Sequence, residues 1–202
     1  AIDSALSGGG PAWGMTSISD GVTRAVGLLS AARSGVPVTM LVLTDGVQTV
    51  DGGDPAAIAA ATAAKAQGVQ LFAVGFGPGP RYGTLEAMAS PPTSTHALLF
   101  ASIEEVRAYF GRNGLCALSG PQAPPSPPTQ PSPPLPPPPP SPPPFAPSPP
   151  RAPTCSLAME LLLVLDRSGS IGQSMPTLLS FARDLVGEFD IGPSLTRVGL
   201  VQ

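Results

Sequence analysis

Three side chains with oxygen ligands alternate along the segment DRSGSIG, namely Asp166, Ser168 and Ser170. The segment directly follows an apolar run at residues 157–165, which we predict to be a buried strand of a parallel sheet. Open parallel sheets place their ligand crevices at the carboxyl ends of the strands. One carboxylate and two hydroxyls at such a place suit a hard cation, and Mg²⁺ in particular takes few carboxylates and keeps several waters. A cation held mostly by neutral hydroxyls also leaves a position open for a carboxylate of another molecule.

Two other interpretations of these three residues are open. A helix-entry cap would explain one of them, since capping requires a single side-chain oxygen, but it does not need all three. A hydrolase would need a base beside Ser168 or Ser170, and none is in view. The one histidine, His96, is predicted to begin a strand and to be structural. We therefore predict metal binding and no enzymatic activity.

The elements around the motif alternate between helix and strand. Apolar β-branched runs predict buried parallel strands, and apolar residues at helical spacing predict helices on both faces of the sheet. Before the proline-rich tract we expect helices at residues 17–33, 54–67, 82–89 and 103–110 and strands at 38–43, 69–77 and 97–100; after it, strands at 157–165 and 197–202 and a helix at 175–189. Asp54 is expected to cap the second helix. The predicted fold class is α/β, with a doubly wound, mostly parallel sheet.

A proline-rich tract separates the two structured segments. Of the 29 prolines, 20 lie between Pro121 and Pro153. Proline lacks a backbone donor and fixes its own φ angle, so we predict a polyproline II spacer of roughly 100 Å at residues 119–154. A ligand for proline-binding modules and a glycosylated rod that anchors the protein to a wall are the alternatives. Serines followed by proline runs resemble the hydroxyproline-rich glycoproteins of plants and green algae, which favours a secreted protein.

Composition excludes several classes of protein. Charged residues make up 11% of the chain and the net charge is −3, so the clustered Lys and Arg of a nucleic-acid protein are missing. One histidine and two cysteines are too few for a zinc cluster. The longest apolar run near the second segment has nine residues, whereas a membrane span needs about 20. The start of the chain shows no signal peptide, and we expect an internal fragment.

The strand, the Asp166-x-Ser168-x-Ser170 motif and the following helix together resemble the metal-ion-dependent adhesion site of von Willebrand factor type A domains. The first segment resembles the rest of that domain. Thr16, after a Gly-Met pair, matches the threonine of the family's glycine-rich loop, and Asp45, in a Thr-Asp-Gly turn, matches its second carboxylate. The resemblance implies that Ser168, Ser170 and Thr16 ligate Mg²⁺, or Mn²⁺ or Ca²⁺, directly. It implies that Asp166 and Asp45 act mainly through water.

In the family, the Asp-x-Ser-x-Ser motif comes before the threonine loop and the Thr-Asp-Gly turn. Here the order is reversed, because Thr16 and Asp45 lie before the proline-rich tract and the Asp166 motif lies after it. We predict that residues 1–118 are the C-terminal two-thirds of one A domain and that 155–202 are the N-terminal part of a second, truncated one. Alternatively, the two segments pair as a circular permutant. In the family sheet order 3-2-1-4-5-6, the second segment would then supply strands 1 and 2 and the first would supply strands 4, 5 and 6. We hypothesise that the isolated chain folds in this second way.

Two cysteines flank the proline-rich tract. Extracellular A domains often carry terminal cysteines that join each other, so the resemblance implies that each cysteine pairs within its own domain in the intact protein. Within this chain, Cys116 with Cys155 is the one intramolecular pairing available, and free thiols are equally compatible with the sequence.

The function implied by the resemblance is extracellular adhesion or ligand binding, with the cation bridging to a carboxylate on a protein partner. Components of a matrix or cell wall are further candidate partners, and nucleic acid and membrane insertion are not expected. The alternative is a structural glycoprotein of the cell wall or matrix. There the proline-rich rod would be the functional part and the A domains would be spacers without metal.

Overall fold

The computed structural model describes residues 16–50, 52–119 and 155–202. The predicted spacer at residues 119–154 therefore lies almost wholly outside the described residues, as do Gly14 and Met15 of the glycine-rich loop. Among the described residues, no helix is long and apolar enough to cross a membrane.

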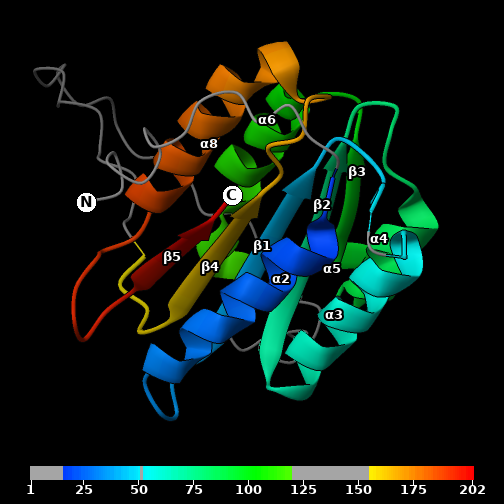
Figure 1. Ribbon diagram of the computed structural model, residues 1–202. Coiled ribbons are helices and arrows are strands. Elements are labelled where there is room, and N and C mark those ends of the chain that lie inside the picture. Colours follow the sequence, from blue (N-terminus) through cyan, green and yellow to red (C-terminus); the bar gives the residue numbers. More distant parts are fainter. Residues whose placement is uncertain (1–15, 51, 120–154) are drawn as a thin grey trace, which may run out of the picture.

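A five-stranded sheet forms the centre of the fold, and its strand order is β3-β2-β1-β4-β5 with every neighbouring pair parallel (Figure 1). The strands are β1 (Val38–Thr44), β2 (Val69–Phe76), β3 (Ala97–Phe100), β4 (Glu160–Leu165) and β5 (Arg197–Val201). The predicted fold class, a doubly wound α/β sheet, is confirmed.

Helices cover both faces of this sheet (Figure 1). One face is covered by α2 (Ile18–Gly27), α3 (Asp54–Ala66) and α4 (Tyr82–Met88), and the other by α6 (Ile103–Asn113) and α8 (Met175–Gly187). Short helices complete the set: the 3₁₀ helices Leu28–Ala31 and Gly172–Ser174, α5 (Thr93–His96) and α7 (Leu115–Ser119). The helix predicted at 17–33 thus changes to a 3₁₀ turn after Gly27.

The two segments on either side of the proline-rich tract share this one sheet. β4 of the second segment pairs in parallel with β1 of the first, in a register that runs from Val38 opposite Glu160 to Leu43 opposite Leu165. Relative to the family order, the observed order corresponds to strands 6-5-4-1-2, so the chain folds in the permuted arrangement that the sequence suggested. Cys116 and Cys155 form a disulfide that joins the segments covalently.

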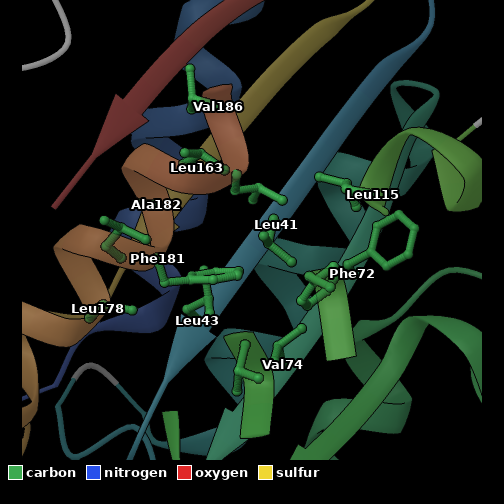
Figure 2. Close-up of a cluster of buried hydrophobic side chains, with 14 of the residues drawn as sticks. Leu41, Leu43, Phe72, Val74, Leu115, Leu163, Leu178, Phe181, Ala182 and Val186 are labelled. Carbon is green, nitrogen blue, oxygen red and sulfur yellow. The ribbon is translucent and has the colours of Figure 1, made fainter. Parts of the chain in front are cut away.

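Side chains along the central strands point alternately to the two faces of the sheet, and this divides the core into two layers. Leu41 and Leu43 of β1 and Leu163 of β4 face α6 and α8, where Phe181 packs against them (Figure 2). On the opposite face, Met40 and Val42 pack against the α2 and α3 side of the sheet. Such strands are apolar at successive positions because both of their faces are buried.

Two predictions about single polar residues were wrong in detail. Asp54 does not cap α3: the cap position is Gly53, with φ 64° and no side-chain bond, and Asp54 begins the helix and accepts hydrogen bonds from Arg81 and Thr84. His96 does not begin a strand but ends α5, directly before β3. It is buried, its Nδ1 lies 3.0 Å from the Ser90 carbonyl oxygen, and its Nε2 lies 3.1 Å from Nε2 of Gln70.

Candidate metal centre

The carboxyl ends of β1 and β4 place two polar turns side by side. Leu43 and Leu165 are register partners at the ends of these strands, and the Asp166 N–H donates to the Leu43 carbonyl at 2.9 Å. Asp166 and Asp45 therefore leave the sheet from adjacent strands. This is the edge of a parallel α/β sheet at which ligands bind, because several strands deliver their following loops to the same place.

A chain of hydrogen bonds connects the two turns. Ser168 Oγ lies 2.8 Å from Ser170 Oγ, and Ser170 Oγ donates to Asp45 Oδ1 at 2.7 Å. Thr44 Oγ1 donates to Asp166 Oδ2 at 2.7 Å, and the Ser168 N–H donates to Asp166 Oδ1 at 2.8 Å. Both carboxylates are thus held in fixed orientations by neutral donors from both segments of the chain.

Thr16 reaches the same place from the start of α2. Its side chain is buried, and its hydroxyl lies 3.7 Å from the point where a Cβ would project from Gly46. Ser170 Oγ lies 3.8 Å from that same point. The absence of a side chain at Gly46 therefore leaves the two hydroxyls facing a shared small space, and a residue other than glycine would fill it.

The structure brings all five predicted site residues together. They come from three loops: Thr16 before α2, Asp45 after β1, and the residues Asp166, Ser168 and Ser170 after β4. A cavity of about 250 Å³ opens beside them and is lined by Thr16, Asp166 and Ser168 together with Arg24, Arg167 and Gln202. Apolar residues of β1 and β4 also line the cavity.

Burial and neighbouring groups act on the ionisation of Asp45. Burial raises the pKa of Asp45; the hydrogen bond from Ser170 lowers it in part, and the charge of Asp166 raises it again. A carboxylate whose ionised form is disfavoured by burial and by a second carboxylate is stabilised by a nearby cation.

The donor set fits a hard divalent cation. Among residues 16–50, 52–119 and 155–202, no group of three or more His, Cys, Asp or Glu could hold a metal ion. An ion at this site would therefore be held by hydroxyl oxygens with at most two carboxylates in support. Such an all-oxygen set suits Mg²⁺ or Ca²⁺ and not a soft metal.

Sequence reasoning missed several residues that shape the site. Thr44 was seen only as part of the Thr-Asp-Gly turn, although its hydroxyl at the end of a strand orients Asp166. Thr49 accepts a hydrogen bond from the Thr16 N–H, Gln48 accepts one from the Ser19 N–H in the first turn of α2, and Gly79 packs against the Asp45 turn. The sequence GFGPGP carried a signal for Gly79, because glycines next to prolines in a loop often mark close backbone approach.

A doubly wound parallel sheet with side-chain oxygens from three loops at its carboxyl end defines the class: an α/β domain with a candidate site for a hard cation. The family model for the von Willebrand factor type A domain matches residues 1–112 and 160–202, and the chain belongs to this family. Domains of this family commonly serve adhesion or ligand binding between proteins, often bind a metal ion and are often extracellular. No curated protein and no solved structure matches the chain significantly.

Proposed function

We propose that this chain binds a divalent cation through Ser168, Ser170 and Thr16 and uses it to bind a carboxylate on a partner protein. The observation that carries the proposal is the chain of contacts from Asp45 through Ser170 to Ser168, together with Thr16 facing the same space over Gly46. These oxygens come from loops far apart in sequence, and a helix cap would require only one of them.

The residues of the site would have two different roles in binding the cation. The hydroxyls of Ser168, Ser170 and Thr16 would be direct ligands, and Asp166 and Asp45 would orient them and accept hydrogen bonds from bound water. When bound, Mg²⁺, Mn²⁺ or Ca²⁺ would supply a charge that neutral hydroxyls compensate only in part. The cavity beside Ser168 and Asp166 would admit the partner's acidic side chain.

We propose binding and not catalysis. His96, the one histidine of the chain, is engaged with Gln70 and Ser90 and does not pair with either serine of the site. We further propose an extracellular or cell-wall location, in keeping with the disulfide between Cys116 and Cys155. An alternative for a longer parent protein is that the two segments belong to successive A domains, with residues 119–154 as a spacer between them.

The direct test is isothermal titration of the purified chain with MnCl₂ and with MgCl₂. We expect one ion per chain for the wild type and no binding for the Ser168→Ala/Ser170→Ala variant, because two of the three proposed direct ligands are removed. Ser30→Ala, which removes an exposed hydroxyl in the 3₁₀ helix that follows α2, is the matched control and should bind normally. No heat from the wild type with either ion, or equal binding by the double variant, would refute the proposal.

A second candidate function rests on composition. The 20 prolines between Pro121 and Pro153 favour a structural glycoprotein of a wall or matrix, in which the A domain is a spacer. Heavy glycosylation of the tract in the natural protein, together with absence of ion binding in the titration above, would favour this alternative.

A further inference from the structure

The side chain of Gln48 is buried in the loop that follows β1, two residues after Gly46, and only 4% of the residue is exposed. A buried amide is costly unless both of its ends form hydrogen bonds. Here Oε1 accepts from the Ser19 N–H at 2.8 Å, while Nε2 donates to Ser19 Oγ at 2.8 Å and to the Val50 carbonyl at 3.0 Å. Gln48 therefore uses both ends of its amide, and two of the three bonds reach Ser19 in α2.

The partner of Gln48 lies in the first turn of α2, where backbone N–H groups have no acceptor within the helix. Ser17, the N-cap residue directly before α2, accepts a hydrogen bond from the Asp20 N–H, and Gln48 supplies the acceptor for the Ser19 N–H from a different loop. The loop after β1 thus runs past the N-terminal end of α2 and is joined to it (Figure 1).

A second pair of bonds lies next to the first. The Thr16 N–H donates to Thr49 Oγ1 at 2.8 Å, and the Thr49 N–H donates to the Thr16 carbonyl at 3.0 Å. Gln48 and Thr49 together hold residues 16–19 against the loop that carries Asp45. Because Thr16 is held by its backbone on both sides, the location of its hydroxyl over Gly46 depends on this attachment.

We propose that Gln48 is a positioning residue for the cation site, which fixes Thr16 opposite Ser170 before the ion arrives. This inference rests on the proposed function and deepens it. Without Gln48, the start of α2 would sample more conformations. Cation affinity would then be lower, because binding would have to order Thr16 at a cost in conformational entropy. Residues that orient direct metal ligands typically contribute 10-fold to 100-fold to metal affinity.

The test compares two substitutions of the same residue. Gln48→Met keeps the length of the side chain and removes all three hydrogen bonds, whereas Gln48→Glu keeps the acceptor for the Ser19 N–H and removes the donor. We expect Gln48→Met to weaken Mn²⁺ binding about tenfold in calorimetry, and Gln48→Glu to weaken it less. Gln67→Met, at an exposed glutamine at the end of α3, is the matched control and should bind as the wild type does.

Two further measurements distinguish a positioning role of Gln48 from a general effect of its substitution on stability. Ser102→Ala removes the cap of α6 on the other face of the sheet and should leave Mn²⁺ affinity unchanged. In the metal-free protein, amide hydrogen exchange of residues 16–21 should be faster in Gln48→Met, with exchange in β4 unchanged. Should Gln48→Met fail to fold, Thr49→Val removes the acceptor of the Thr16 N–H and tests the same attachment.

The outcomes distinguish this inference from the function on which it rests. If the wild type binds Mn²⁺ and Gln48→Met, or Thr49→Val in its place, binds equally tightly, the positioning role is overturned and the proposed function stands. If the wild type binds no divalent ion, both are overturned, whatever the exchange measurements show.

Discussion

Two polar clusters join the two segments of the chain, one at each end of the central strands. The basal cluster lies at the start of β4 and consists of Glu160, Arg33 and Arg197. The carboxyl-end cluster lies beyond the other end of the same strand and consists of the five predicted site residues, Thr16, Asp45, Asp166, Ser168 and Ser170. The carboxylate of the basal cluster is buried and those of the carboxyl-end cluster are half-buried, and the negative charges are balanced in different ways.

In the basal cluster the protein supplies its own cations. Arg33 Nε lies 2.8 Å and Arg197 Nε 3.0 Å from the two oxygens of Glu160, whose side chain is 7% exposed. Burial alone raises the pKa of Glu160, but the hydrogen bonds of the two guanidinium groups outweigh it and hold the pKa below its ordinary value. The remaining guanidinium donors bind backbone carbonyls, among them those of Met159 and Leu195. This cluster is complete and serves the fold.

In the carboxyl-end cluster the donors are neutral. Asp45 and Asp166 accept hydrogen bonds from hydroxyls and a backbone N–H, and the pKa of Asp45 is raised by burial. At the start of β4, the protein thus balances a buried carboxylate with its own guanidinium groups. At the other end of the sheet it holds two half-buried carboxylates with hydroxyls and a backbone N–H, and under the proposed function a bound cation balances their charge.

The largest effect is expected at the basal cluster. Glu160→Gln should lower the free energy of unfolding by about 3 kcal/mol at pH 7, because it leaves two guanidinium groups without their carboxylate. Urea denaturation measures this loss, and Glu86→Gln, at an exposed glutamate, is the control. Divalent-ion affinity should not change. A variant that lost ion affinity with its stability would contradict the division between the two clusters.

The effect of Glu160→Gln on the free energy of unfolding should depend on pH. The pKa of Glu160 in the folded chain lies below its ordinary value of 4.5, so its contribution to stability is complete above pH 4.5 and is lost as the pH falls through the folded pKa. The wild type and Glu160→Gln should therefore become more similar in stability below pH 4.5. A difference that stayed constant over this range would show that the charge of Glu160 is not what stabilises the fold.

A smaller loss of stability is expected for a substitution at Gly79, which lies in the loop between β2 and α4 and packs against the Asp45 turn. A Cβ at this position would collide with the Asp45 carbonyl oxygen and would stand 3.0 Å from the Gly46 Cα, so the backbone of the turn would have to move. Gly79→Ala should weaken Mn²⁺ binding about tenfold and lower the free energy of unfolding by about 1 kcal/mol. Calorimetry and urea denaturation measure the two effects.

Gly83→Ala is the matched control for Gly79, because a Cβ at Gly83 meets no atom within 4 Å and the residue lies in α4. It should leave ion affinity unchanged and stabilise the chain slightly, since alanine favours a helix over glycine. Equal ion affinity in Gly79→Ala and Gly83→Ala would remove the argument that this loop supports the site.

The sequence predicted the central strands β1, β2 and β4 because a strand buried on both faces is a local, continuous apolar run, although β4 begins at Glu160 and not at residue 157. The spacing of Asp166, Ser168 and Ser170 was also local, and it indicated the site without further information. Thr16 and Asp45 required the family resemblance, because they lie in a different segment and only the pairing of β1 with β4 brings them to the motif.

The supporting contacts could not be predicted in the same way. Gln48 meets Ser19 across 29 positions and Glu160 meets Arg33 across 127, and no local pattern encodes such partners. Glu160 stood in the sequence as a charged residue inside an apolar run, with nothing to indicate that two arginines surround it. Asp54 was assigned to a cap from its neighbours, whereas its partners Arg81 and Thr84 follow from the packing of α3 against α4.

The central claim is that the carboxyl-end cluster holds a cation with a coordination position open to a carboxylate from outside. Water-proton relaxation of the Mn²⁺-loaded chain tests it directly, because bound Mn²⁺ that retains exchanging water enhances relaxation and loses the enhancement when that water is displaced. We predict an enhancement that requires Asp166, shown by its loss in Asp166→Asn, and that falls when acetate is added. No enhancement, or one that acetate leaves unchanged, would contradict the account.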